Sequence, residues 1–250
     1  MTALDDLKRE VATVADARGA PVKLWIRDDD AVAETAELRV FLGQLSEYRA
    51  PAVLAVIPGA LLPTLQPAVA RHAAIRVATH GWRHANHAAA DAKKSEYPVG
   101  RDRAEVASEL GQGRRIIAET FGAQATGMFV PPWNRIDGAW MPTVASAGFD
   151  TVSAYADAHA SDGAASVARA NTHVDLMDWR GGRIGKPVDV VLSELGAAVQ
   201  RYAERAPAVG ILTHHLVHDM DAHLALARLL DWVANSADAE LVDISAVSSQ

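Results

Sequence analysis

Short runs of apolar, often β-branched residues alternate along the chain with longer segments whose apolar residues recur at helical spacing. This alternation is typical of a mostly parallel β-sheet with helices packed outside it. The predicted strands cover residues 22–26, 52–57, 75–79, 127–130, 149–153, 173–177, 209–213 and 240–244. The predicted helices cover residues 35–48, 61–72, 101–121, 139–147, 187–205 and 221–235, and the N-terminal segment also has a helical pattern.

The succession of strand–helix repeats predicts the fold class α/β, as a distorted (β/α) barrel of about seven or eight parallel strands with outer helices. Periodicity does not show whether a sheet closes, so an open doubly wound sheet is the alternative. The chain has 250 residues, half of them hydrophobic, which is enough to bury such a core. It carries no internal repeat and no Pro/Gly linker, so we predict one domain, residues 1–250, with two long loops at 86–100 and 154–171.

Composition narrows the chemistry. A formal net charge of −7 argues against nucleic acid or an anionic membrane as the main partner. Without cysteine, disulfides and thiolate metal sites are excluded, and any metal must be held by His, Asp or Glu. We see neither the apolar core of a signal peptide nor a stretch that could span a bilayer, so we expect a cytoplasmic protein. The sequence carries no signal for an oligomeric state.

Polar residues capable of catalysis gather directly after three predicted strands. An acidic triplet follows the first strand, and one histidine cluster follows each of the strands at 75–79 and 209–213. Because the C-terminal ends of the strands in an α/β barrel line one rim, these clusters can converge there. Their members are Asp28, Asp29 and Asp30; His80, His84 and His87; and His214, His215, His218 and His223.

The first histidine cluster has the spacing of a metal site. His80 and His84 lie four residues apart, which places both imidazoles on one face if the segment is helical. Together with a carboxylate from the triplet they would supply three protein ligands and leave a position open for water. A coincidental pair and a solvated acidic turn are the alternatives. His214 and His218 have the same spacing, so a second metal site is a further alternative.

The remaining rim residues have both chemical and structural interpretations. His214 ends a strand and could donate a proton to a leaving group, whereas we interpret His215, His218 and His223 as surface histidines at a polar helix start. Trp133 follows two prolines and could wall the site, or could belong to a rigid loop over the core. Asp178 could hydrogen-bond a rim histidine or pair with a surface arginine.

Taken in order, these segments resemble the motifs of the polysaccharide deacetylase family, carbohydrate esterase family four, whose members include chitooligosaccharide deacetylases. The matching segments span most of the chain and are Asp29-Asp30, His80 with His84, Val130-Pro-Pro-Trp133, Asp178-Trp179 and Leu212-Thr-His214. Two departures mark a divergent member. Val130 stands where the family has an arginine that pairs with the catalytic aspartate, a charge that Arg27 or Arg135 could supply. Ala31 replaces a glycine, and the extra Asp28 leaves Asp28-Asp29 as an alternative register.

The resemblance implies a bound divalent ion, commonly zinc, and a metal-dependent hydrolase that removes an acyl group, such as acetyl, from an amide such as an N-acetylated sugar. An amidase for a small cyclic imide or allantoin-like substrate and a non-catalytic sugar-binding relative are the alternatives. By position, the resemblance and the rim location predict metal ligands Asp30, His80 and His84; a general base Asp29; a general acid His214 oriented by Asp178; and substrate contacts from Trp82, His87, Pro132, Trp133, Asn134 and Trp179.

The predicted loops and tryptophans also suggest a substrate size. Loops at 86–100 and 154–171 follow rim strands and could cover the site, and Trp82, Trp133 and Trp179 would narrow it. We therefore expect a preference for a mono- or disaccharide amide, or a compact imide, over a long polymer.

Overall fold

The computed structural model describes residues 2–158 and 167–247. The predicted loop at 154–171 therefore lies partly outside the described residues. In the part of the chain that is described, no helix is both long and apolar enough to cross a membrane.

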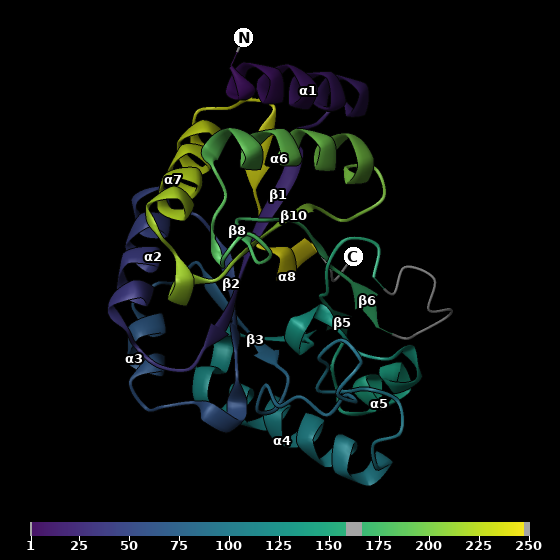
Figure 1. Cartoon of the computed structure of the whole chain (residues 1–250). Helices are drawn as coiled ribbons and strands as arrows, with labels where there is room; N and C mark the ends of the chain where they lie inside the picture. Colours follow the sequence, from purple (N-terminus) through teal and green to yellow (C-terminus); the bar gives the residue numbers. More distant parts are fainter. Residues whose placement is uncertain (1, 159–166, 248–250) are drawn as a thin grey trace.

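The centre of the molecule is a nine-stranded sheet whose neighbouring strands pair in parallel (Figure 1). The strand order is β6-β5-β4-β3-β2-β1-β10-β7, and β11 pairs with the first residues of β1. The strands are β1 (Val22–Ala31), β2 (Ala52–Val56), β3 (Ile75–His80), β4 (Ala125–Val130), β5 (Thr151–Val152), β6 (Ala168–Arg169), β7 (Thr172–Asp175), β10 (Val209–Thr213) and β11 (Ala239–Leu241).

The sheet curls into a distorted barrel because one continuous segment joins its two edges. β6 pairs with β5, and β7, which follows directly in the chain, pairs with β10. Between these pairings, Thr172 forms a parallel bridge with Tyr155, just beyond β5. The predicted α/β barrel is confirmed, and the alternative of an open doubly wound sheet does not fit this connection.

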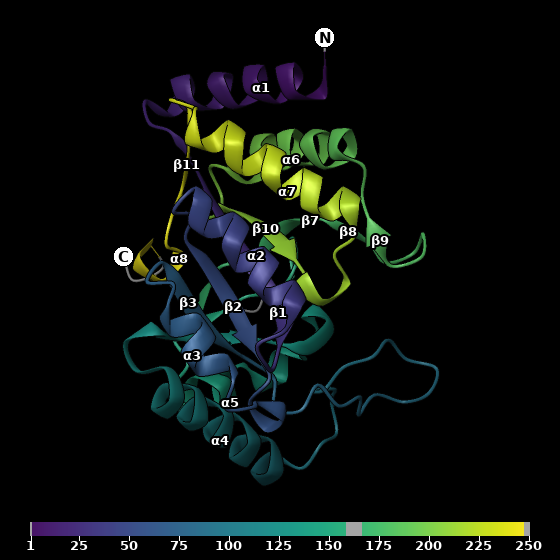
Figure 2. The same cartoon turned by 90° about the vertical axis from the view of Figure 1, so that its left-hand side faces the viewer.

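Helices cover the outer face of the barrel, and α1 lies outside α6 as an additional layer (Figures 1 and 2). The α-helices are α1 (Ala3–Arg18), α2 (Ala36–Glu47), α3 (Leu65–Ala70), α4 (Arg103–Phe121), α5 (Met141–Ser146), α6 (Val188–Tyr202), α7 (Met220–Ala234) and α8 (Ile244–Val247). Single 3₁₀ turns are η1 (Pro58–Ala60), η2 (Gly122–Gln124), η3 (Pro132–Asn134), η4 (Gly138–Trp140) and η5 (His215–Val217).

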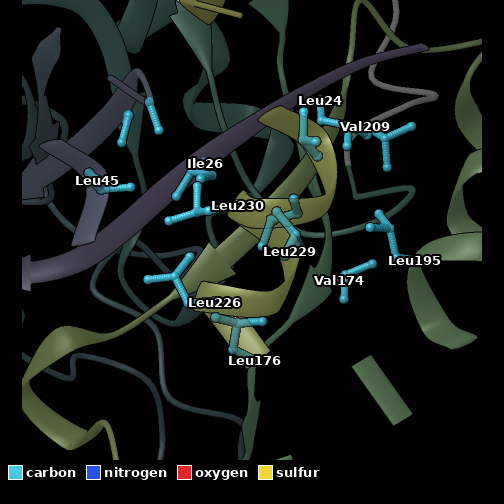
Figure 3. Packing of buried hydrophobic residues seen from close by; sticks show 14 of the residues in the cluster. Leu24, Ile26, Leu45, Val174, Leu176, Leu195, Val209, Leu226, Leu229 and Leu230 are labelled. Carbon is cyan, nitrogen blue, oxygen red and sulfur yellow. The ribbon is translucent and has the colours of Figure 1, made fainter. Parts of the chain in front are cut away.

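The main hydrophobic core lies between the sheet and these helices, because successive side chains of a strand point to opposite faces. From β1, Leu24 and Ile26 point outward and pack with Leu226 and Leu230 of α7 (Figure 3). A smaller cluster fills the barrel interior, where Trp25 of β1 meets side chains from the other strands. Outward and inward residues of β1 therefore alternate strictly up to the point where polar residues begin.

Two predicted strands differ from the structure at positions that matter for the site. The first predicted strand, 22–26, continues to Ala31, so the acidic triplet lies inside β1 and not after it. The predicted strand 173–177 breaks after Asp175, whose Oδ1 accepts the N–H of Met177 at 2.9 Å. The chain then forms a hairpin in which β8 (Met177–Asp178) pairs antiparallel with β9 (Ile184–Gly185).

The predicted strand 240–244 also differs. β11 ends at Leu241, and Ile244 begins α8, where it packs into the barrel interior. In Figure 2, α8 lies at the left of the barrel, whereas the hairpin β8–β9 projects to the right. The interior cluster thus occupies one end of the barrel, and the opposite end, where the parallel strands finish, holds the polar residues.

Candidate metal and catalytic site

The acidic triplet on β1 is divided by the pleat of the strand. Arg27 and Asp29 continue the inward series begun by Trp25, whereas Asp28 points outward. Asp30 would point outward as well in a regular strand. Instead, the register with β2 shifts between Asp28 and Ala31, and Asp30 adopts a φ of 73°. This irregularity turns Asp30 into the same cavity as Asp29.

Arg27 lies buried beneath Asp29 and binds both of its carboxylate oxygens, with Nε–Oδ1 and Nη2–Oδ2 distances of 2.8 and 2.9 Å. The same guanidinium donates to Ser153 and, at 2.6 Å, to Oδ1 of Asn134. Of the two arginines offered in place of the motif arginine, Arg27 is the one that pairs with Asp29. Arg135 donates to the carbonyl of Lys94 instead.

Asp30, His80 and His84 form the one group in the described part of the chain that could hold a metal ion, with ligand atoms within 4.8 Å of one another. Oδ1 of Asp30 lies 3.1 Å from Nε2 of His80 and 3.4 Å from Nε2 of His84. Nδ1 of His80 lies 3.0 Å from the carbonyl oxygen of Val130, a partner that orients the ring and presents Nε2 to the site.

The charges of this group are coupled. Burial alone would raise the pKa of Asp30, but the hydrogen bond with His80 and the neighbouring histidine charges lower it well below its ordinary value. Burial works to lower the pKa of His80, yet the carboxylates of Asp29 and Asp30 raise it. Burial and the charge of His80 lower the pKa of His84. The carboxylates thus favour a proton on His80, and a cation bound beside them would take the place of that proton, since an imidazole nitrogen binds a metal only when it is deprotonated.

Residues 80–84 are not helical, so the two imidazoles are not brought together by one face of a helix. His80 ends β3, and the chain then turns through Gly81 and His84, whose φ angles are 59° and 57°. A Cβ on Gly81 would lie 2.0 Å from Oε2 of Glu96 and 2.5 Å from Pro132, so this position requires glycine. The turn folds His84 back toward His80, with ring centroids 5.2 Å apart.

Glu96, which we did not predict, holds this turn in place. Its buried carboxylate accepts the backbone N–H groups of Trp82, Arg83 and Ala85 at 2.9, 2.8 and 3.2 Å. Residues 86–100 form the predicted loop, with a single bridge to Ile136. The Glu96 carboxylate belongs to this loop. The loop therefore supports the turn that carries His84 and contributes no side chain to the cavity wall.

His214 faces the aspartates from β10. Its Nε2 lies 4.0 Å from Oδ2 of Asp29, and its ring stacks edge-on against Trp179 at 4.6 Å. Trp179 donates its Nε1–H to Oδ2 of Asp175 at 2.8 Å. Burial raises the pKa of Asp175, and the neighbouring charge of His214 acts against that rise. His214 therefore has an unpredicted acidic neighbour in Asp175.

Asp178 does not have the position predicted for it. Its Oδ1 accepts the backbone N–H groups of Arg180 and Gly181 at 3.0 and 2.8 Å, which closes the turn of the β8–β9 hairpin. It lines the cavity, but in the described part of the chain no hydrogen bond or ion pair joins it to His214. The break after β7 is the reason, because it places Asp175 on the barrel wall and Asp178 out on the hairpin.

Among residues 2–158 and 167–247, the second histidine cluster forms no group of three candidate metal ligands, and His215 is not a surface residue. His215 is fully buried, its Nδ1 is hydrogen-bonded to Oδ1 of Asp28, and its backbone N–H donates to Oδ2 of Asp28 at 2.8 Å. His218 is hydrogen-bonded to the hydroxyl of Thr213. Asp28 is thus committed to the outer layer, and the pair that faces the cavity is Asp29-Asp30.

The cavity at this end of the barrel has a volume of about 770 Å³. Three of the predicted substrate contacts line it, namely Trp133, Asn134 and Trp179. The ring centroid of Trp133 lies 4.2 Å from that of His84. Trp133 and Asn134 reach it through left-handed φ angles of 55° and 57° directly after the prolines. Tyr155, from the partly described loop, lines it as well, and burial raises its pKa to about 12, so the hydroxyl keeps its proton.

Three of the predicted substrate contacts do not line the cavity. Pro132 is buried behind Gly81, and His87 is exposed on the loop. Trp82 lies on the far side of the turn, beneath the guanidinium of Arg83 at 5.6 Å. The absence of Trp82 from the wall follows from the turn geometry, because a tight turn that brings His80 and His84 together points the residues between them away. The cavity residues that we did not predict are Arg135, Tyr155, Asp175, Met177, Arg180, Arg183 and Lys186.

Comparison with known proteins yields structures only, since no protein-family model and no curated protein sequence matches the chain. A candidate polysaccharide deacetylase from Mycobacterium smegmatis is 16% identical, with 91% of this chain and 89% of that chain covered and a TM-score of 0.69. A family 4 acetyl xylan esterase from Clostridium thermocellum, solved with a cobalt ion, is 13% identical (91% and 90% covered, TM-score 0.57).

A family 4 carbohydrate esterase from Streptomyces lividans, solved with acetate, is 16% identical, with 89% of this chain and 98% of that chain covered and a TM-score of 0.55. These identities are low, but the alignments run through nearly the whole of each chain. The resemblance first seen in the ordered motifs is therefore confirmed at the level of architecture, and the chain has the fold of the polysaccharide deacetylases of carbohydrate esterase family four.

Proposed function

We propose that the protein is a metal-dependent hydrolase that removes an acyl group, most simply acetyl, from the nitrogen of an amide such as an N-acetylated sugar. The observation that carries this proposal is the convergence of two groups in one cavity. The first group is Asp30, His80 and His84, and the second is Asp29 with His214; all five line the same cavity. A carboxylate and an imidazole on opposite sides of a reacting carbonyl are the parts that general acid–base hydrolysis requires.

The three ligand residues fit a divalent ion, with zinc as the first choice. Two imidazole nitrogens and one carboxylate are the usual protein ligands of catalytic zinc, and three such ligands leave a position for water or substrate. The hydrogen bond between His80 and the Val130 carbonyl is the outer partner that such a ligand usually has. When bound, the ion would polarise the acyl carbonyl and make water more acidic.

Asp29 is the proposed general base. Arg27 holds both of its oxygens in place from below, so the carboxylate keeps one orientation toward the cavity. In the reaction, Asp29 takes a proton from water as the water oxygen bonds to the carbonyl carbon. Because Arg27 is itself fixed by Ser153 and Asn134, the base is anchored to two further elements of the barrel wall.

His214 is the proposed general acid. It gives its proton to the amide nitrogen as the carbon–nitrogen bond breaks, which releases a free amine and a carboxylic acid. Nε2 of His214 lies 4.0 Å from Oδ2 of Asp29, so the proton taken from water would return to the imidazole through one intervening water. Asp175 is a candidate positioning residue, since it contacts Trp179 and acts electrostatically on His214.

The walls of the cavity support a small substrate. Trp133 stands beside His84 and Trp179 beside His214, so an apolar ring face lies on each side of the proposed reacting centre. A volume of about 770 Å³ is within the range of small-molecule sites and suits a mono- or disaccharide. We propose these, or a compact amide, as substrates in preference to long polymers.

A substrate panel with the zinc-loaded protein tests this function. The panel contains N-acetylated mono-, di- and longer oligosaccharides, simple N-acetyl amides and cyclic imides, with release of amine and acetate as the measurement. We expect acetate release from an N-acetylated mono- or disaccharide. Hydrolysis of cyclic imides alone would favour the imide amidase, and zinc binding without hydrolysis of any member would contradict the proposed activity. A kcat/KM that rises steadily with oligosaccharide length would contradict the preference for small substrates.

A further inference from the structure

The hairpin β8–β9 brings two arginines to the cavity that the proposed reaction does not use. Its turn carries Arg180 and Arg183, and both line the same cavity as Asp30, His80 and His84. The hairpin lies outside the main sheet and projects from the molecule in Figure 2. No strand of the barrel depends on these two side chains, so their location calls for another explanation.

Arg180 and Arg183 form no ion pair with any described residue. Lys186 at the base of the hairpin pairs with Glu194 at 2.9 and 2.7 Å, as a structural cation does. Neither Arg180 nor Arg183 has a carboxylate within 4.0 Å among residues 2–158 and 167–247. Arg135, on the opposite wall, adds a third guanidinium that donates only to a backbone carbonyl there.

The carboxylates that line the cavity have hydrogen-bond partners other than Arg180 and Arg183. Both oxygens of Asp29 accept from Arg27, and Asp30 faces its two histidines. Asp175 accepts from Met177 and from the indole of Trp179, and Asp178 accepts two backbone N–H groups of the hairpin turn. Three guanidinium groups without an ion pair to a described residue, those of Arg135, Arg180 and Arg183, thus line this cavity in a chain with a net charge of −7.

The hairpin holds Arg183 close to the proposed chemistry. The guanidinium carbon of Arg183 lies 5.5 Å from the ring centroid of Trp179. The ring centroid of His214 lies 4.6 Å from that of Trp179, in an edge-to-face contact. The backbone N–H of Arg183 donates to the carbonyl of Asp178 at 3.0 Å, and Arg183 keeps a left-handed φ of 62° that is unfavourable for arginine. A single aromatic ring therefore separates this cation from the proposed general acid.

We propose that the substrate is an anionic acyl amide, an N-acylated sugar acid or sugar phosphate whose carboxylate or phosphate is bound by Arg180 and Arg183. The proposal rests on the proposed function for the amide end and adds the class of the other end. Guanidinium groups bind carboxylate and phosphate through paired N–H donors, which gives direction as well as charge. The ring of Trp179 would lie along the sugar between the two ends.

Calorimetric titration of the zinc-loaded protein tests the charge preference apart from turnover. The probes are N-acetylglucosamine, N-acetylglucosamine 6-phosphate and N-acetylmuramic acid, which share the amide and differ in charge. We expect at least one anionic probe to bind about tenfold more tightly than the neutral sugar, as charge-assisted hydrogen bonds would produce. The advantage should shrink as salt is added, because the guanidinium groups are exposed. Comparison of the two anionic probes separates phosphate from carboxylate.

The variant Arg180→Gln/Arg183→Gln is the decisive arm. Its control, Arg115→Gln/Arg228→Gln, removes the same charge from exposed positions on α4 and α7 that do not line the cavity. The anionic preference should disappear in the first variant and persist in the second. Equal affinity for all probes, absence of binding by both anionic probes, or a preference that survives in the Arg180/Arg183 variant would overturn the proposal. The last result would place the anion on the metal group.

Turnover of the same probes separates this inference from the proposed function. Anionic preference without hydrolysis would contradict the hydrolase and leave the anion site standing. Hydrolysis of neutral and anionic sugars with equal kcat/KM would support the hydrolase and overturn the anion site.

Discussion

Aspartate and histidine meet on both faces of β1, with different consequences. On the inner face, Asp29 lies 4.0 Å from His214 across an open cavity. On the outer face, Asp28 is bonded directly to His215, and both are buried beneath α2, where the ring of Phe41 lies 6.3 Å from the imidazole. Neighbouring residues of the same types thus form a candidate catalytic pair on one face and a structural pair on the other.

The comparison shows that the pleat of the strand, and not residue type, decides which of these groups is available for chemistry. Asp28 is buried on the outer face, where it bonds the backbone and the ring of His215, so no substrate in the cavity can reach it. The inner pair, Asp29 and His214, is separated by 4.0 Å, and both residues line the cavity. The predictions below test this division between the two faces.

The largest expected effect concerns the two neighbouring aspartates. Asp29→Asn should lower kcat/KM by a factor on the order of 10² to 10⁴, because the amide cannot take the proton of water. Its zinc content should stay that of the wild type. Asp28→Asn should keep most of its activity below its unfolding temperature, since its side chain faces away from the cavity. Loss of zinc in Asp29→Asn would show that the register is wrong and that Asp29 is a metal ligand.

The free energy of unfolding should depend more on Asp28 than on Asp178. Asp28→Ala leaves His215 buried without its partner, and we expect a loss of about 3–5 kcal/mol in the free energy of unfolding. Asp178→Ala removes hydrogen bonds from an exposed hairpin turn and should cost about 1 kcal/mol. Urea unfolding monitored by circular dichroism measures both. Equal losses in the two variants would mean that the outer pair is not a structural element.

Two buried histidines of the outer layer, His173 and His215, should make stability depend on pH in opposite directions. Burial lowers the pKa of His173, which has no acidic hydrogen-bond partner, to about 4, whereas Asp28 raises the pKa of His215 against the effect of burial. Between pH 6.5 and 4, unfolded His173 takes up a proton and folded His173 does not, so its contribution to stability falls as pH falls. The loss should reach about 2 kcal/mol at pH 5.

His173→Gln should therefore lose less stability than the wild type between pH 7 and pH 5, although it starts lower at pH 7. The contribution of His215 has the opposite sign, since a raised pKa gives stability that is lost as pH rises. Unfolding free energies of wild type and His173→Gln at the two pH values provide the measurement. Parallel losses in both proteins would show that folded His173 takes up its proton as readily as the unfolded residue does.

The smallest effect distinguishes Asp175 from Asp178. If Asp175 positions the Trp179 and His214 pair, Asp175→Asn should lower kcat roughly tenfold with little change in KM, equivalent to one lost hydrogen bond. Asp178→Asn should change kcat by less than that, because its carboxylate serves the hairpin backbone. The reverse order would restore the role first predicted for Asp178.

Much of the barrel could be predicted because its strands are continuous runs of β-branched and apolar residues with a local signal. The Asp29-Asp30 register was also accessible, since Leu24 and Ile26 mark the outer face and alternate positions mark the inner one. Asp30 itself breaks that alternation through its positive φ, and only the motif resemblance placed it in the site.

The residues that were missed depend on contacts between distant segments. Glu96 supports the turn after β3 from a loop with no helix or strand of its own, and nothing in its local sequence distinguishes it from a surface carboxylate. Asp175 was hidden by a predicted strand that continued past it. Arg180 and Arg183 reach the cavity because a hairpin forms between the predicted strand 173–177 and the predicted helix 187–205, where no element was predicted. Their positions follow from chain breaks that periodicity does not show.

Metal content tests the central claim most directly, and the chain provides a matched control for it. His84 belongs to the Asp30 and His80 group, whereas His87 is exposed and does not line the cavity. Elemental analysis after zinc loading and removal of free metal should find about one zinc ion per chain in the wild type and in His87→Ala. His84→Ala should lose most of the zinc while its circular dichroism stays unchanged. Full zinc content in folded His84→Ala would contradict the site on which this account rests.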